Sequence, residues 1–141
     1  MVIIFCGVPG SGKSTIAKLL KEKLEKFGKT RIFVSDKVSG KVYKRWRDEV
    51  LALAGKEAVI VIYVYCKLET CIERNKKRKP SLPERVIHII NRKIERPENP
   101  YVSINTDTTQ PEEAVSKVLA KVTTRKQNDH FPKFASQIIK Q

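Results

Sequence analysis

The chain has 141 residues, of which 40% are hydrophobic, and it carries a formal net charge of +14. This length fits one compact domain with a single core and excludes a second sizeable domain. The apolar start stops at Cys6 and no later apolar run reaches membrane-spanning length, so neither a signal peptide nor a membrane segment is expected, and a cytoplasmic protein is expected.

The first third of the chain alternates between apolar runs and helical periodicity. Residues 2–5 form a continuous apolar run that predicts a strand buried on both faces of a parallel sheet. Apolar residues after Lys13 recur at helical spacing as far as Gly28, which could cap the helix. A second strand over 31–35 would place Asp36 at its carboxyl end. A helix is predicted over 41–54, where Trp46 reads as core, with base stacking as the alternative.

The remaining elements repeat this alternation. Residues 58–65 are the strongest strand signal and should lie centrally in the sheet. Helices are predicted over 68–78 and from 84 to the proline at 97, followed by a strand over 101–105 and a helix that starts near 109. The order predicts a three-layer α/β fold with a small, mostly parallel sheet flanked by helices. Residues 1–122 would form this domain, and 123–141 a polar tail that could dock as a helix.

Residues 7–14 fit the P-loop pattern G-x-x-x-x-G-K-[ST], between a predicted strand and a predicted helix. Glycines let backbone N–H groups approach phosphate oxygens, and the helix directs its positive end at them. Lys13 would contact the β- and γ-phosphates, and Ser14 would ligate Mg²⁺. The motif predicts a P-loop NTPase fold whose ATP and Mg²⁺ site consists of Gly7, Pro9, Gly10, Ser11, Gly12, Lys13, Ser14 and Thr15.

Phosphoryl transfer also needs an acidic group near the metal and cations near the transferred phosphate. Asp36 is the best acidic candidate, as a base or a metal ligand, with a turn-forming role as its alternative. Asp107 follows the fourth strand and could line the same crevice. Arg74 and Arg78 lie one helical turn apart and could stabilise transition-state charge from a lid, or belong to a solvated helix end. The predicted catalytic residues are Lys13, Asp36, Arg74 and Arg78, and the predicted metal ligands are Ser14 and Asp36.

Other polar residues leave alternatives open or suggest no role. Basic residues cluster at 41–47 and 74–79, which could bind RNA or simply form a solvated surface. Cys6, Cys66 and Cys71 lack the paired spacing of a zinc site and are expected to behave as small hydrophobes in a reducing cytosol. His88 lies between Ile87 and Ile89, is expected to have no nearby acidic partner and is assigned no function.

Several stretches resemble known kinases. Residues 3–17 are similar to the loop and first helix of many small P-loop kinases. Residues 63–75 (YVYCKLETCIERN), 95–100 and 104–108 resemble adenylylsulfate kinase, and 47–50 and 82–87 resemble O-phosphoseryl-tRNA kinase. These stretches together make up about a third of the chain. The resemblance implies transfer of the γ-phosphate of ATP to a hydroxyl of a nucleotide-type substrate, or of RNA such as an aminoacyl-tRNA.

The chain departs from adenylylsulfate kinases between Gly28 and Ala58, where it has about thirty residues. Those kinases carry a longer segment there, with an Asp-Gly-Asp motif, substrate-binding arginines and a phenylalanine, and an extra strand. Asp36 could match the acidic substrate-site residue of that family or the acidic residue after the next strand in tRNA kinases. An ATP-binding regulatory NTPase that docks on RNA or on a protein partner, without phosphorylating it, is the alternative function.

Overall fold

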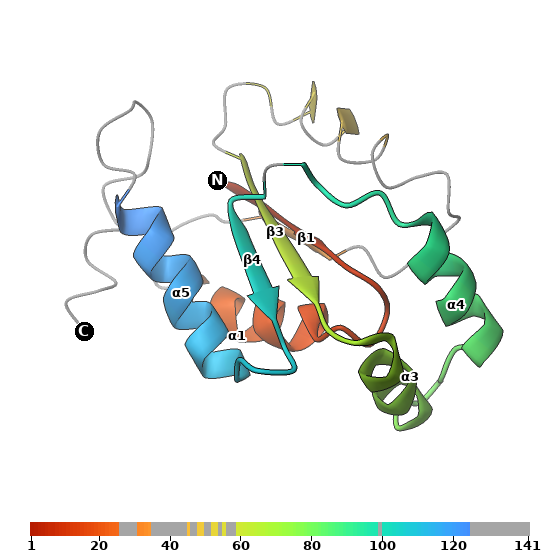
Figure 1. Cartoon of the computed structure of the whole chain (residues 1–141). Coiled ribbons are helices and arrows are strands. Elements are labelled where there is room, and N and C mark those ends of the chain that lie inside the picture. The colour runs from red at the N-terminus through yellow and green to blue at the C-terminus, as the bar shows by residue number, and fades with distance from the viewer. Residues whose placement is uncertain are drawn as a thin grey trace.

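Figure 1 presents a computed structural model of the chain, which describes residues 1–25, 31–34, 45, 48–49, 52–53, 55, 59–98 and 100–124. Its centre is a four-stranded parallel sheet in the order β2-β1-β3-β4. The strands are β1 (Val2–Cys6), β2 (Arg31–Val34), β3 (Val59–Tyr65) and β4 (Val102–Asn105). The two most continuously apolar runs, β1 and β3, are the central strands, as the sequence predicts.

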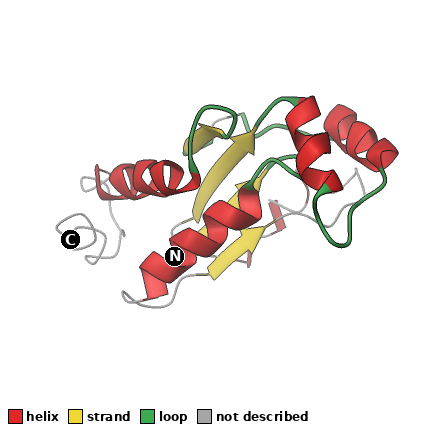
Figure 2. Ribbon diagram, turned by 90° about the horizontal axis from the view of Figure 1, so that it is seen from below, coloured by secondary structure: helices red, strands yellow, loops and turns green. Residues whose placement is uncertain are grey.

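Helices connect these parallel strands. They are α1 (Lys13–Leu24), α3 (Leu68–Lys76), α4 (Glu84–Lys93) and α5 (Pro111–Thr124). Figures 1 and 2 show α1 and α5 side by side on one face of the sheet, with α3 and α4 grouped near its carboxyl end. The predicted α/β fold with a small parallel sheet flanked by helices is confirmed.

Several predicted features fall wholly or partly outside the described residues. Of the helix predicted over 41–54, only residues 45, 48, 49, 52 and 53 are described, and all five are helical. The glycine expected to cap the first helix, Gly28, lies outside the described ranges. Helix α5 continues to Thr124, and residues 125–141 are not described, so the docked tail stays a prediction.

The main core lies between the sheet and the pair α1 and α5. Alternate strand residues point to this face, including Phe5 and Ile62, and the helices contribute Leu20 and Val115, all at 0% exposure. Every second residue of the strands and every third or fourth residue of the helices therefore face one another across a single interface. Because α1 is fixed against β1 through this core, the position of the segment between them is fixed as well.

A smaller apolar cluster attaches α3 and α4 to that same segment. Val8, in the loop after β1, packs with Cys71 of α3 and Ile87 of α4, and all three are buried. On the other face of the sheet, Ile4 and Cys6 pack with half-buried residues of β3. No described helix is long and apolar enough to cross a membrane.

Candidate functional site

The segment between β1 and α1 is a tight loop closed by backbone hydrogen bonds. The N–H of Ser11 donates to the carbonyl of Val8 at 3.0 Å, and the N–H of Ile16 donates to the carbonyl of Gly12 at 3.2 Å as α1 begins. Gly12 is the N-cap of α1 and adopts a left-handed conformation with φ 101°. The N–H groups of the first turn of α1 and its positive dipole end therefore face the loop.

Two glycines of the loop leave no room for a side chain. A Cβ on Gly7 would meet the carbonyl oxygen of Val64, and one on Gly10 would meet the carbonyl oxygen of Cys71. Gly10 also has a positive φ of 85°, a backbone conformation that residues other than glycine rarely adopt. The loop is therefore held between the end of β3 and α3, at the place where the motif predicts a phosphate cradle.

Lys13 places its charge inside this loop. The residue is only 2% exposed, and its Nζ donates to the carbonyls of Gly7 at 2.8 Å and Val8 at 2.9 Å. Ser14 and Thr15, the next residues of α1, are exposed. They open onto a cavity of about 350 Å³ lined by Gly10, Gly12, Lys13, Ser14, Thr15, Arg74, Lys77 and Arg78.

Arg74 reaches from α3 across the loop to the segment after β4. Its Nη1 donates to Thr106 Oγ1 at 2.8 Å and to the carbonyls of Gly10 and Ser11 at 3.4 and 3.3 Å, and its Nη2 donates to the Thr106 carbonyl at 3.1 Å. The Thr106 hydroxyl lies 2.6 Å from the Ser11 carbonyl. The guanidinium therefore holds the loop from its outer side, a geometry that assigns Arg74 a positioning role.

Arg78 belongs to the turn after α3 and not to the helix itself, which ends at Lys76. It lines the cavity together with Lys77, and both are exposed. The predicted basic lid thus borders the loop, with Arg74 held at its base and the other two cations nearer to solvent. A catalytic role of Arg78 stays a prediction.

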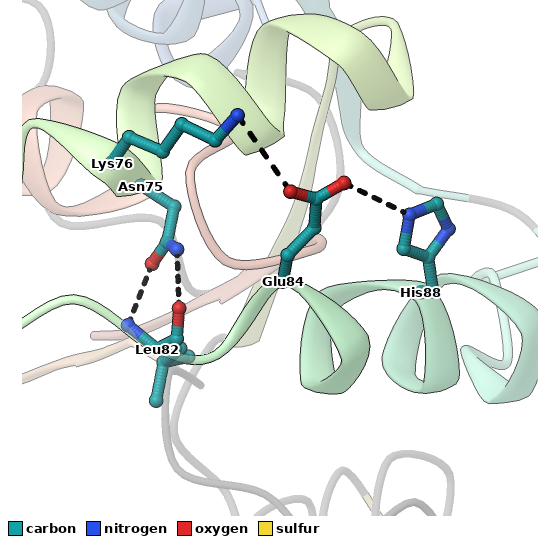
Figure 3. Close-up of polar contacts among 5 residues, drawn as sticks. All are labelled: Asn75, Lys76, Leu82, Glu84 and His88. Atoms are coloured by element: carbon teal, nitrogen blue, oxygen red, sulfur yellow. Dashed lines mark hydrogen bonds and ion pairs between the residues drawn. The ribbon is translucent and has the colours of Figure 1, made fainter.

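The connection between α3 and α4 depends on a residue that the sequence does not single out. Asn75 is 2% exposed, and its amide donates to the carbonyl of Leu82 at 2.7 Å and accepts from the N–H of Leu82 at 3.0 Å (Figure 3). Both ends of the basic turn 77–82 are thereby joined. Nothing in the sequence around Asn75 marks it as special, so its role can be recognised only from its contact with Leu82 in the structure.

Glu84 adds two surface ion pairs at the same place. It lies 3.6 Å from Lys76 Nζ and 3.6 Å from His88 Nε2 (Figure 3). The expectation that His88 has no acidic partner is wrong, because a residue four positions earlier in a helix lies on the same face.

Asp107 binds to the start of α3. Its carboxylate accepts from the Thr70 hydroxyl at 2.6 Å and from the N–H of Lys67 at 2.7 Å. The Thr70 hydroxyl and then the Lys67 N–H lower the pKa of Asp107, because both stabilise the ionised form. The carboxylate therefore holds the start of α3, while its place in the ligand crevice stays a prediction.

The residues of the loop fit a nucleotide with its Mg²⁺. The exposed hydroxyl of Ser14 is the described side chain that could ligate the ion, alongside phosphate oxygens and water. Among the described residues, no group of three His, Cys, Asp or Glu could hold a metal by itself. Asp36, the other predicted ligand, lies outside the described residues, so its role stays a prediction.

An aromatic pair that sequence reasoning did not single out lies at the carboxyl end of the central strand. The rings of Tyr63 and Tyr65 are stacked, with centroids 5.4 Å apart and planes at 19°. Burial raises the pKa of Tyr63, and the neighbouring guanidinium of Arg96 opposes that shift. Tyr65 is 39% exposed, so this pair presents an accessible ring at the ligand-binding end of the sheet.

Comparisons with known sequences identify three kinds of similar protein. Residues 1–50 match the model of a family described as chromatin associated protein KTI12. An adenylyl-sulfate kinase of Thermodesulfovibrio yellowstonii is 30% identical over 162 aligned residues, which cover 84% of this chain and 81% of that protein. The L-seryl-tRNA(Sec) kinase of Homo sapiens is 42% identical over 57 residues, which cover 39% of this chain and 16% of the human protein.

Solved structures support the same fold. The crystal structure of APE1195 matches with a TM-score of 0.65 and 22% identity, over 88% of this chain and 95% of that one. The Mycobacterium tuberculosis APS kinase CysC, in complex with AMPPNP and APS, matches with a TM-score of 0.63 and 18% identity, over 86% of this chain and 96% of that one.

Proposed function

Because this chain belongs to the adenylyl-sulfate kinase family, we propose that it is an ATP-dependent kinase that phosphorylates a hydroxyl group of a nucleotide-type acceptor. The observation that carries the proposal is the loop after β1, where glycine backbone, the buried Lys13 and the start of α1 converge on one cavity. This arrangement suits a triphosphate because backbone N–H groups, a cation and a helix dipole all favour anionic oxygens.

Each residue of the loop has a distinct task in this proposal. The backbone N–H groups bind phosphate oxygens, and Lys13 moves its ammonium from the carbonyls of Gly7 and Val8 to the β- and γ-phosphates. Arg74 keeps the loop in the conformation that presents those N–H groups. Mg²⁺ neutralises phosphate charge when it is bound, and Ser14 and Asp36 are its proposed protein ligands.

The acceptor would bind beside the aromatic pair. The exposed ring of Tyr65 offers a stacking surface for a base, and Arg96 offers a cation for a nearby anionic group. Because the alignment with the bacterial kinase is longer than this chain, that relative carries residues with no counterpart here. A nucleotide that needs fewer contacts than adenylylsulfate, or an RNA end such as an aminoacyl-tRNA, therefore fits this chain as well.

Transfer of labelled phosphate tests the proposal. The protein is incubated with γ-³²P-ATP and Mg²⁺ and, separately, adenylylsulfate, small nucleosides and total tRNA, and the labelled products are resolved. We expect one acceptor pool to become labelled, with loss of the label in Lys13→Ala. The matched control is Lys18→Ala, because Lys18 is an exposed lysine of the same helix. Equal labelling by both variants would show that the loop does not bind the phosphate donor.

The second candidate is a regulatory NTPase that docks on RNA or on a protein partner without phosphorylating it. The match of residues 1–50 to the KTI12 family model supports this alternative, because it covers the nucleotide loop and that family is described as chromatin associated. In the same assay it predicts free labelled phosphate, released faster in the presence of RNA, and no labelled acceptor. A phosphorylated acceptor would exclude it.

A further inference from the structure

Two cysteines meet beside the nucleotide loop. Cys66 follows β3 and Cys71 lies on the inner face of α3, and their sulfur atoms are 2.9 Å apart. Both are free thiols, Cys66 half-buried and Cys71 2% exposed. Cys66 is thus the more exposed residue of the two, while Cys71 is held against it from the protein interior.

The surroundings make the two thiols unequal. The hydrogen bond with Cys71 lowers the pKa of Cys66 to about 7, an effect that burial opposes and that Thr106 and the charge of Arg74 support. Asp107 acts weakly in the other direction. The same hydrogen bond and burial raise the pKa of Cys71. At neutral pH Cys66 is therefore a partly ionised nucleophile with a protonated partner in contact.

Both cysteines also touch the loop. The Cys66 sulfur lies 4.0 Å from the carbonyl of Gly10 and 3.8 Å from Arg74 Nη1, which also bonds the carbonyls of Gly10 and Ser11. The Cys71 carbonyl packs against Gly10 so closely that a Cβ would not fit. Any relative movement of the two sulfur atoms is therefore transmitted to the backbone that would bind phosphate.

We propose that Cys66 and Cys71 form a redox-sensitive pair whose oxidation by a peroxide to a disulfide weakens nucleotide binding at the neighbouring loop. The Cys66 thiolate attacks one peroxide oxygen and becomes a sulfenic acid. The other oxygen leaves as hydroxide and takes up a proton from solvent, equivalent to the one that the Cys66 thiol released, to give water. The Cys71 sulfur then displaces the sulfenic hydroxyl, which leaves as a second water with the Cys71 proton. In sum two thiols and one hydrogen peroxide give one disulfide and two water molecules.

A disulfide requires the two sulfur atoms to approach by roughly 0.9 Å from their present contact. That approach draws the end of β3 and the first turns of α3 together and shifts the Cys71 carbonyl against Gly10. We expect roughly ten-fold weaker nucleotide binding in the oxidised protein, because contacts from a rigid backbone to phosphate tolerate misplacement poorly.

Peptide mass mapping tests bond formation without reference to nucleotide. The protein is treated with hydrogen peroxide, blocked with an alkylating reagent and digested with trypsin without reductant. Because Lys67 separates the two cysteines, cleavage places them on peptides 57–67 and 68–74. We expect these peptides to be joined, with the mass of the pair lowered by two hydrogen atoms. Oxidation of Cys66 to a sulfinic acid, or a disulfide between two chains, would overturn the proposal.

The effect on the loop is tested by titration with a fluorescent ATP analogue before oxidation, after oxidation and after re-reduction. This part of the proposal rests on the proposed function. We expect reversible weakening in the unaltered chain and in Cys6→Ala, whose buried cysteine lies in β1 and is not part of the pair, and no change in Cys66→Ser. Unchanged binding by a fully cross-linked protein would overturn the proposal. If the reduced protein fails to bind the analogue, the proposed function fails, whereas the peptide result still decides the disulfide.

Discussion

At the scale of single residues, the loop is held by side chains outside the motif that defines it. Arg74 fixes its carbonyls, and Asp107 fixes the helix that carries Arg74. Charged hydrogen bonds of this kind are stronger than neutral ones and are costly to leave half-made in a partly buried place. Both residues can therefore be tested by changes that preserve the rest of the site.

Replacement of Arg74 by glutamine should weaken nucleotide binding roughly ten-fold and lower the free energy of unfolding by about 2 kcal/mol. The reason is the loss of the forked guanidinium that bonds Gly10, Ser11 and Thr106 together. Arg74→Lys keeps the charge and should not restore binding, whereas Arg92→Gln, an exposed change in α4, should have no effect. Isothermal titration and urea denaturation measure both quantities. Full rescue by lysine would favour a purely electrostatic role.

The stability that Asp107 supplies should depend on pH. Because its pKa in the folded state is lowered below the ordinary 3.8, its contribution is complete above that value and is lost as the pH falls through the lower, folded-state pKa. Asp107→Asn should therefore be less stable than the unaltered chain at neutral pH, and the difference should shrink in acid. Urea denaturation across this pH range measures it. A difference that stays constant with pH would contradict the role of the carboxylate charge.

At the scale of elements, the site depends on how α3 and α4 are joined to the loop. Their shared cluster with Val8 brings the basic turn 77–82 to the cavity, and the buried amide of Asn75 closes that turn. The segment between the end of α3 and the start of α4 is not helical. The side chain of Asn75 therefore bonds the backbone of Leu82, which in a longer helix would have been bonded by other backbone groups.

Asn75→Ala should lower the free energy of unfolding by about 2 kcal/mol, because it leaves both backbone groups of Leu82 without their partner. Hydrogen exchange at the Leu82 amide should accelerate as well. The matched control is Glu84→Gln, which removes only surface ion pairs to Lys76 and His88 and should cost less than about 1 kcal/mol. Equal losses in the two variants would mean that the amide does not close the turn.

At the scale of the whole molecule, one large apolar interface positions everything else. The core between the sheet and the helices α1 and α5 fixes β1 and α1, and so both ends of the loop. The net charge of +14 adds a long-range attraction for anions over the whole surface, which favours nucleotides and RNA without choosing between them.

Leu20→Ala should lower the free energy of unfolding by about 3 kcal/mol, because Leu20 is fully buried between the sheet and α5 and its removal leaves a cavity. The control is Leu53→Ala, a leucine that is 86% exposed, which should change stability by less than about 0.5 kcal/mol. Urea denaturation measures both. A loss in Leu20→Ala as small as in the control would show that this interface does not carry the fold.

The amino-acid sequence by itself determined the alternation of strands and helices, the central position of β1 and β3 and the glycine loop with Lys13. Each of these is encoded by residues close together in the chain, through apolar period, β-branched runs or a fixed motif. Helix boundaries were less accurate, as at α3, where the helix stops at Lys76 because the turn that follows is closed by Asn75.

Only the tertiary structure decided what surrounds the loop. Lys67 and Asp107 are 40 positions apart and Gly10 and Arg74 are 64 apart, yet each pair is in contact. The sulfur contact between Cys66 and Cys71 likewise depends on how α3 turns away from the end of β3. A local pattern reports which face a residue occupies within its own element, whereas the partner across an interface is set by how separate elements pack.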